Sequence, residues 1–446
     1  MTLDGIIVGA GAAGLMAALR AASLGLEIAV LDPNPGDSNL ARSGGMFSAA
    51  GTRFQAASGV ADGPARWTAE ILASTHGAID PAILEIVTGR AADAAHFLSD
   101  EAEIPLHLVT GVTLAAGVPR LHATPAESGH ELASLLLAAL HAHGGTVLAQ
   151  EVLGLETVHA RVAGIRIASG TLHASWTLLA SGGFGANRRM LARFAPEITD
   201  AVYIGSPAND GRAILWAEAL GAQLLFMDSY QGQGHATPDG AGRLGPGLGS
   251  FGAILVNADG HRFADEAISP SSMAAHVLAQ PGGWAIEIFD AAAHQAALRF
   301  GPYREATARG AIGQAATSQA LAARFGLPLD ALAATLATPP VRPLEPPFFA
   351  ARITGALAHT QGGLRVDSQA RVLDNFRHPI PGLLAAGGGA ASISGRGAAG
   401  YIPGNGLAHA FTLGMVAAET MAAYRPKIDP ASARASRARQ APTSTE

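Results

Sequence analysis

Three glycines near the start of the chain, Gly9, Gly11 and Gly14, follow the spacing Gly-x-Gly-x-x-Gly. An apolar run at residues 3–8 precedes them, and Asp32 ends a second apolar run farther on. In a strand–turn–helix unit, the first glycine permits the tight turn, the second lets the backbone approach a pyrophosphate, and the third lets the helix pack against the strand. The carboxylate can accept hydrogen bonds from ribose hydroxyls. The stretch therefore predicts a dinucleotide-binding Rossmann unit with phosphates at the helix N-terminus.

The composition limits the classes of protein and of site. The chain has 446 residues, of which 49% are hydrophobic and 14% charged, enough for two or three domains with a large core. A net charge of -6 argues against nucleic acid as a main partner. The lack of cysteine excludes disulfides, thiolate metal sites and covalent haem, and nothing resembles a metal site. The apolar runs are too short or interrupted to span a bilayer and no signal peptide fits, so we expect a cytoplasmic protein.

Periodicity and further glycine clusters indicate how the chain is divided. Helices are expected over 12–24, 80–100, 127–143 and 405–424, and strands over 146–148, 164–168, 176–180 and 383–386. Glycine clusters follow the last two strands, as suits the far side of a dinucleotide. These features predict an α/β fold in which a Rossmann-like nucleotide-binding domain carries an inserted α+β capping domain. The expected limits are 1–190 and 346–424 for the nucleotide domain, 191–345 for the capping domain and 425–446 for a disordered tail.

Several glycine-containing stretches occur in a fixed order from about residue 3 to residue 424. They are Gly9-Ala-Gly-Ala-Ala-Gly14, Ser38-Asn-Leu-Ala-Arg-Ser-Gly-Gly45, Ala180-Ser-Gly-Gly-Phe184, Asn209-Asp-Gly211, Gly252-Ala-Ile-Leu-Val-Asn257 with Gly260-His-Arg-Phe263, His359-Thr-Gln-Gly-Gly363 and Gly404-Asn-Gly406. In this order they resemble the flavoproteins of the fumarate reductase and succinate dehydrogenase group, which also contains L-aspartate oxidase and the 3-ketosteroid dehydrogenases.

The resemblance implies FAD as the cofactor, a substrate held between the capping domain and the flavin ring, and hydride transfer between flavin N5 and a carbon–carbon bond. Membrane-bound members hold flavin covalently on a histidine where this chain has Ser38, so FAD is expected to be non-covalent. The residues implied along the cofactor are Gly9, Gly11, Ala12, Ala13, Gly14, Asp32, Ser38, Asn39, Arg42, Ser43, Gly44, Gly45, Val152, Ala180, Ser181, Gly182, Asp210, Gly387, Gly388, Asn405, Gly406 and Leu407.

Four departures from the family concern the groups that handle fumarate. The arginine that donates a proton in fumarate reductases is replaced by Pro270, and the glutamate and second arginine of their proton relay are replaced by Pro246 and Gly249. The arginine that clamps a substrate carboxylate is replaced by Tyr401. A dicarboxylate is therefore a poor fit, because desolvated carboxylates need paired cations or charge-assisted donors.

In having a tyrosine at the clamp position, this chain resembles the 3-ketosteroid dehydrogenases. There a tyrosine hydroxyl and a glycine N–H polarise a ketone oxygen, a role open to Tyr401 with Gly404 or Gly406. Polarisation acidifies the neighbouring C–H bond, so that a base removes the proton while hydride goes to FAD. This chain departs from the family pattern by three extra residues between Gly387 and Tyr401, within the stretch 391–397. Tyr401 either faces the substrate or only packs.

Two histidines are candidate catalytic groups. His359 stands next to the family's substrate-binding histidine position, although the true equivalent is either His359 or Ala358. His235 lies near a second such position, where Gln233 is the competing equivalent and a substrate-binding candidate.

Tyr230, a few residues before His235, is a candidate base, and Thr360 is a candidate substrate-binding residue. Arg396, in the insertion, binds either a substrate carboxylate or a loop carbonyl.

The leading hypothesis is an FAD-dependent dehydrogenase that desaturates a cyclic ketone, or the reverse ene reductase. The alternatives are a carboxylate desaturase or reductase that uses Arg396 or another arginine of the capping domain, and a catalytically degenerate flavin-binding protein. The expected partners are a small-molecule substrate and an unidentified electron acceptor or donor.

Overall fold

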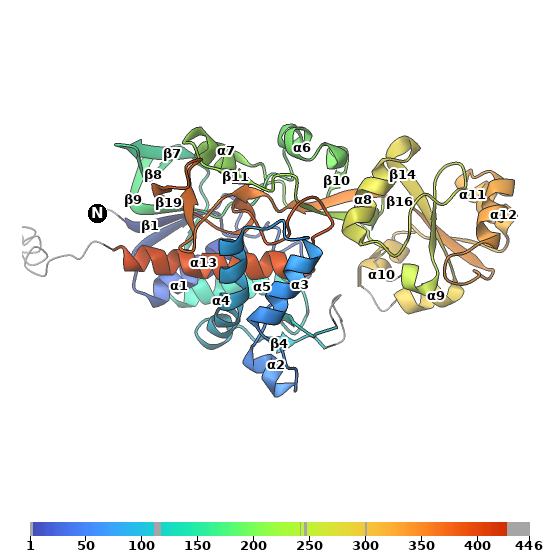
Figure 1. Cartoon of the computed structure of the whole chain (residues 1–446), viewed down its shortest axis with the longest axis horizontal. Helices are drawn as coiled ribbons and strands as arrows, with labels where there is room; N and C mark the ends of the chain where they lie inside the picture. Colours follow the sequence, from blue (N-terminus) through green and yellow to red (C-terminus); the bar gives the residue numbers. More distant parts are fainter. Residues whose placement is uncertain (1–2, 111–116, 241, 245–247, 299–300, 426–446) are drawn as a thin grey trace, which may run out of the picture.

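Two β-sheets organise the chain, one in each half of the molecule in Figure 1. The structure is a computed structural model that describes residues 3–110, 117–240, 242–244, 248–298 and 301–425. The tail expected at 425–446 lies outside this range except for its first residue. None of the helices within the described residues combines the length and the hydropathy needed to cross a membrane.

The larger sheet is mostly parallel. Its strands follow the order β18 (Arg371–Leu373), β19 (Pro379–Ala385), β9 (Gly170–Leu179), β1 (Leu3–Val8), β2 (Ile28–Leu31) and β6 (Val147–Leu148). β8 (Arg161–Ile167) pairs with β9, and β7 (Val152–Val158) pairs with β8. β1 pairs in parallel with β2 on one side and β9 on the other. The parallel pairs β19–β9 and β2–β6 extend this core, and the α/β class expected from the sequence is confirmed.

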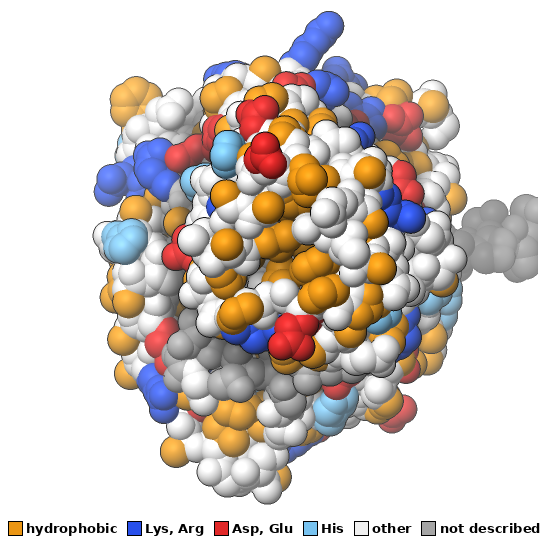
Figure 2. Space-filling view, turned by 90° about the vertical axis from the view of Figure 1, so that its right-hand side faces the viewer, with side chains coloured by type: hydrophobic (Ala, Val, Ile, Leu, Met, Phe, Trp, Pro, Cys, Tyr) orange, Lys and Arg blue, Asp and Glu red, His pale blue; other side chains and the backbone are white. Residues whose placement is uncertain are grey.

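The smaller sheet is built around one long strand, β16 (Phe348–Thr360). Beside it lie β10 (Val202–Tyr203), β12 (Tyr230–Ala236), β14 (Trp284–Asp290) and β15 (Gly313–Ala315), with β13 (Ile254–Val256) next to β14. Its helices are α8 (Pro270–Leu278), α9 (Ala291–Ala297), α10 (Gly301–Ala308), α11 (Ser318–Phe325) and α12 (Leu329–Ala337). Figure 2 shows this end of the molecule, with hydrophobic side chains across the middle of the face among polar atoms. The division into nucleotide and capping domains stays a prediction.

The remaining elements are short or lie around the larger sheet. The long helices are α1 (Ala12–Ser23), α3 (Pro64–Ser74), α4 (Pro81–Asp100), α5 (Gly129–Ala142) and α13 (Asn405–Ala423), which match the expected helices within a few residues where one was expected. The short ones are α2 (Arg53–Ala57), α6 (Arg188–Phe194), α7 (Arg212–Ala219), β3 (Phe47–Ser48), β4 (His107–Leu108), β5 (Leu121–Ala123), β11 (Leu224–Leu225), β17 (Gly363–Leu364) and the single turns η1 (Pro196–Ile198), η2 (Gly249–Phe251), η3 (Pro281–Gly283) and η4 (Gly387–Gly389).

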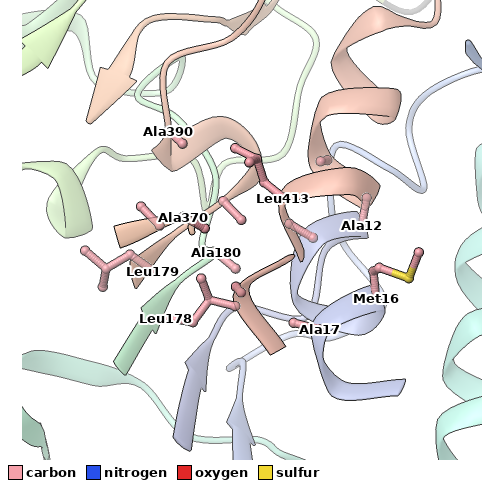
Figure 3. Packing of buried hydrophobic residues seen from close by; sticks show 14 of the residues in the cluster. Ala12, Met16, Ala17, Leu178, Leu179, Ala180, Ala370, Ala390 and Leu413 are labelled. Carbon is pink, nitrogen blue, oxygen red and sulfur yellow. The ribbon is translucent and has the colours of Figure 1, made fainter. Parts of the chain in front are cut away.

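Small side chains let α1 and α13 lie against each other and the larger sheet. Figure 3 labels Met16 and Ala17 on α1, Leu178 on β9 and Leu413 on α13, which are all buried and belong to one hydrophobic cluster. The burial is nearly complete, and each leucine removed from water contributes about 1.5–3 kcal/mol. This packing fixes the first turns of both helices beside the ends of the parallel strands.

Gly14 sets how closely α1 approaches β1. An ideal Cβ there would overlap the carbonyl oxygen of Gly9 and lie 3.3 Å from the Cγ2 atom of Ile7. We expect Gly14→Ala to lower the free energy of unfolding by about 1–3 kcal/mol, the usual range for overpacking. Chemical denaturation of the FAD-loaded protein measures the change. Gly36→Ala is the matched control, because no atom lies within 4 Å of its ideal Cβ. Equal stability of the two variants would contradict the close approach.

Candidate active site

A cavity of about 640 Å³ lies between the two sheets, beside the carboxyl ends of β1, β2 and β9. This is the edge of a parallel α/β sheet at which ligands bind. The first turns of α1 and α13 form part of the wall, and β12, β16 and the loop after β12 form the opposite part. One continuous space therefore joins the glycine turn to the smaller sheet.

Nearly all the residues expected along the cofactor line this cavity. Those in its wall are Gly9, Gly11, Ala12, Ala13, Asp32, Ser38, Asn39, Arg42, Ser43, Gly44, Gly45, Val152, Ala180, Ser181, Gly182, Asp210, Gly387, Gly388, Gly406 and Leu407. The two exceptions are Gly14, which packs behind the turn, and Asn405, which is fully buried in the first turn of α13. Their direct contact with the cofactor stays a prediction.

Asp32 is held in the wall by the backbone around it. Its Oδ2 atom accepts a hydrogen bond of 2.8 Å from the amide of Ala10, and its Oδ1 atom accepts one of 2.8 Å from the amide of Asn34. These bonds connect the end of β2 to the glycine turn, so the carboxylate has a fixed direction. A carboxylate oxygen has lone pairs for more than one donor, which leaves capacity for ribose hydroxyls.

Asn209 connects three stretches that surround the cavity. Its Oδ1 atom accepts a hydrogen bond of 3.1 Å from the amide of Gly183, and its Nδ2 atom donates one of 3.1 Å to Oδ1 of Asn39. The same Oδ1 of Asn39 accepts a bond of 2.7 Å from the amide of Ser206. Segments far apart in the sequence thus share one buried polar network.

Two features of the wall and one buried residue next to it fit an FAD molecule. Gly11 caps α1 without a side-chain hydrogen bond, so the first N–H groups of the helix remain available to a pyrophosphate. An ideal Cβ on Gly11 would meet only the Cβ of Ser38, at 4.0 Å, so this side of the turn is open. Asn405 is buried, and neither polar atom of its amide has a partner among the described residues. A buried amide without a partner is rare unless a ligand or water satisfies it.

His359 and Tyr401 come together at the end of the cavity beside the smaller sheet. We call it the substrate end, because the resemblance implies that the substrate lies there. Their ring centroids lie 6.4 Å apart, with the planes at 77°. The Nδ1 atom of His359 is 3.2 Å from the carbonyl oxygen of Thr360, which requires the proton on Nδ1 and leaves Nε2 as an acceptor in the neutral ring. An ideal Cβ at Gly406 of α13 would lie 3.4 Å from Cε1 and 3.7 Å from Nε2 of His359. Burial lowers the pKa of His359, and the bond to Thr360 only partly opposes this, so the ring is neutral near pH 7.

Tyr401 keeps its proton at neutral pH. Burial raises the pKa of the Tyr401 hydroxyl above its ordinary value, and the positive charge of Arg243 opposes the shift without cancelling it. The hydroxyl is therefore a hydrogen-bond donor inside the cavity. Gly404, the candidate partner of Tyr401, also lies in the wall, just before the first turn of α13.

Two residues of β12 face elsewhere. The Nδ1 atom of His235 is 2.9 Å from Oε2 of Glu287, and both side chains are buried in the smaller sheet. Burial acts against the charged imidazole, but the carboxylate outweighs it, so the pKa of His235 is raised. Burial also raises the pKa of Tyr230, as does nearby Glu197. Neither His235 nor Tyr230 lines the cavity.

Gln233 and Arg396 also lie outside the wall. The Oε1 atom of Gln233 accepts a hydrogen bond of 3.2 Å from the amide of His235. Arg396 is 67% exposed and its Nη1 atom is 3.4 Å from Asp228. Thr360 does line the cavity, but its Oγ1 atom accepts a bond of 3.0 Å from the amide of Phe184.

The cavity also contains side chains that we did not single out from the sequence. Gln231, Arg243 and Glu305 line its substrate end. Gln231 stands inside the stretch that drew attention to Tyr230 and His235, so the region was recognisable although the residue was not. Arg243 lies in a glycine-rich loop with no periodic pattern, which offers no signal.

Two of the three positions that correspond to the fumarate reductase relay lie outside the cavity wall. Gly249 lies in η2 and Pro270 begins α8, and neither lines the cavity. Pro246 lies outside the described residues. Within the part of the chain that the structure describes, no group of three or more histidine and acidic side chains is placed to hold a metal ion.

A family profile described as FAD binding domain matches residues 4–407 of this chain. The chain belongs to this FAD binding domain family. A probable fumarate reductase of Shewanella frigidimarina (strain NCIMB 400) is 27% identical over an alignment that covers 95% of this chain and 75% of the relative. The expected cofactor, FAD, and the resemblance to fumarate reductases and ketosteroid dehydrogenases are confirmed.

Two solved structures share the arrangement. The open conformation of a flavocytochrome c3 fumarate reductase superposes with a TM-score of 0.81 at 25% identity, covering 95% of this chain and 78% of that one. The 3-ketosteroid-Δ4-(5α)-dehydrogenase of Rhodococcus jostii RHA1, in complex with 4-androstene-3,17-dione, gives 0.74 at 25% identity, covering 94% and 97%. The chain is thus an FAD-dependent oxidoreductase similar to both reductases and dehydrogenases.

We expect FAD to leave the protein on acid precipitation. Ser38 lines the cavity and its hydroxyl accepts a hydrogen bond of 3.3 Å from the amide of Ala41, so this position has no imidazole to form a covalent link. Absorbance of the supernatant and of the redissolved pellet measures the distribution of the flavin. Flavin that stays with the precipitated protein would contradict the non-covalent assignment.

Proposed function

We propose that this flavoprotein moves a hydride between FAD and a carbon–carbon bond beside a carbonyl group, either by desaturating a cyclic ketone or by reducing the corresponding enone. Bound FAD supplies the two-electron acceptor or donor. The observation that carries the proposal is the protonated hydroxyl of Tyr401 inside the cavity, where fumarate reductases have an arginine. A separate electron partner would return the flavin to its starting state.

In the desaturating direction, Tyr401 and His359 have separate roles. Tyr401 donates a hydrogen bond to the ketone oxygen, and the negative charge that develops there is stabilised without a net cation. The Nε2 atom of His359, unprotonated in its tautomer, accepts the proton that leaves the α-carbon. The β-hydrogen leaves with its electron pair, so a double bond forms and the charges balance. In the reverse direction His359 returns the proton.

The lowered pKa of His359 suits this role at neutral pH, because a base must be unprotonated to act. The N-terminus of α13 places Gly404 and Gly406 in the wall beside the two side chains. Backbone N–H groups at a helix start favour a developing negative charge. The hydroxyl, the imidazole and the helix end therefore support one chemistry.

The other two hypotheses are less well supported. A carboxylate substrate bound by Arg396 is disfavoured because that arginine is exposed beside Asp228. The part of this hypothesis that uses another arginine of the expected capping domain keeps one candidate, Arg243, which lines the cavity. A degenerate binding protein is disfavoured because the cavity combines a neutral base with a protonated donor.

A panel of compounds tests the three hypotheses. We expect a saturated cyclic ketone to bleach the flavin absorbance anaerobically, and an enone to restore the absorbance of the reduced protein. Fumarate should be turned over negligibly, since losing a positioned proton donor costs about 100- to 10,000-fold. Fumarate turnover above about 1 per second would overturn the proposal. A flavin that responds to no compound would instead favour the degenerate protein.

Tyr401→Phe should leave FAD bound and slow the reduction of the flavin by a ketone about 100-fold or more, as for one lost oxyanion donor. The loss should fall on the reduction step, because the charge on oxygen develops mainly in the transition state. Stopped-flow absorbance measures it. Tyr424→Phe is the control, since Tyr424 is exposed and its hydroxyl bonds to Gln369. Equal reduction rates in wild type and Tyr401→Phe would make Tyr401 a packing residue.

A further inference from the structure

The charged side chains of the cavity fall into two groups. At the nucleotide end they pair with each other, as in Arg42–Asp37 at 2.6 Å and Arg212–Glu151 at 2.6 Å. At the substrate end, Arg243 lines the wall, and none of the described residues forms an ion pair or side-chain hydrogen bond with its guanidinium. A partly buried cation without a partner is unfavourable unless a ligand or solvent compensates it.

The backbone that carries Arg243 is fixed to β12. Arg243 forms an antiparallel bridge with Ala236, and the amide of Leu244 donates a bond of 2.9 Å to the carbonyl of His235. The amide of Thr237 donates a bond of 2.9 Å to Gly242. The guanidinium is thus attached to a hairpin and not to a free loop.

Two contacts hold this hairpin in place. The buried pair of His235 and Glu287 fastens its base to β14. An ideal Cβ at Gly242 would lie 3.0 Å from the Cβ of Ala306, so the hairpin lies directly against α10. The position of the Arg243 backbone is therefore set by the smaller sheet.

The two charges at the substrate end differ in sign. The charge of Arg243 reaches the Tyr401 hydroxyl, whose pKa it lowers against the effect of burial. Glu305 of α10 lines the same end and is exposed. A ligand with one anionic group can pair with Arg243, whereas a second anionic group nearby would face the carboxylate of Glu305.

We propose that Arg243 binds a single anionic group of the substrate, which makes the substrate a ketone or enone with one carboxylate away from the reacting bond. This inference rests on the proposed function and names its substrate class. Tyr401 binds the carbonyl oxygen and Arg243 binds the carboxylate, so the two contacts orient the reacting carbons between them.

Matched probes test the inference on the FAD-loaded protein. The probes are 4-oxocyclohex-2-ene-1-carboxylate and its carboxamide, which differ in charge and keep the same enone. Titration of the flavin absorbance gives their dissociation constants, and reoxidation of the reduced protein gives their rates. Wild type should bind the carboxylate more tightly, and Arg243→Met should weaken the carboxylate about 10- to 100-fold while changing the carboxamide less than about 3-fold.

Two further variants complete the design. Arg243→Lys should keep part of the preference for the carboxylate, since the charge remains while the two-pronged geometry is lost. Arg352→Met is the matched control, because Arg352 stacks on Trp284 at 4.1 Å and lies outside the cavity wall. FAD content and thermal denaturation identify any variant that fails to fold.

The outcomes separate the inference from the function. Reoxidation by both probes, with equal affinities that Arg243→Met leaves unchanged, would overturn the role of Arg243 and leave the proposed function intact. If Arg243→Met keeps FAD but loses the binding of both probes, the role of Arg243 would also be overturned. A specific contact with an anion affects the binding of the carboxylate alone. Failure of the wild type to react with either probe would count against the proposed function, and the inference would fall with it.

Discussion

The structure depends on one constraint at the edge of the larger sheet, where the first turns of α1 and α13 meet in the same cavity. The first N–H groups of a helix have no partner within the helix. Gly11 and Gly404 cap these helices without a side-chain hydrogen bond, so both turns need an external acceptor. A cofactor with a pyrophosphate and an electron-rich ring edge supplies acceptors for both. The close packing of α1 on α13 keeps the two turns in register.

The smaller sheet brings the proposed base into this cavity on one strand. β16 is 13 residues long, and its last residues, His359 and Thr360, reach the cavity wall while its first residues pack at the far end. The imidazole that we assign as the base is therefore carried by a strand paired along its length and not by a flexible loop. A base held on a rigid element keeps its distance to the substrate, which favours catalysis by orientation.

The glycine patterns indicated residues that line one cavity, because these patterns report backbone geometry. Close approach at Gly14 and the open face of Gly11 require the absence of a side chain, so the residue type itself encodes the structure. The residues of β12 were harder to place. Its pairing with β16 shifts register after Gln231 and again after Gln233, so alternation along the strand does not say which side chains face the cavity. Arg243 depends on the fold of a glycine-rich hairpin, for which local sequence has no signature.

In the proposed site, the arginines that the family uses are absent and one other arginine is present, so this chain need not share the substrate of its reductase relatives. By resemblance, arginines are lost at Gly249, Pro270 and Tyr401, whereas the cation now present, Arg243, enters from a different hairpin. A carboxylate that is taken out of water on binding needs a paired cation, because its desolvation is not repaid otherwise. One cation beside a neutral hydroxyl therefore suits one anionic group and one carbonyl oxygen. In this proposal the buried pair of His235 and Glu287 acts indirectly, because it holds the base of the hairpin that carries Arg243.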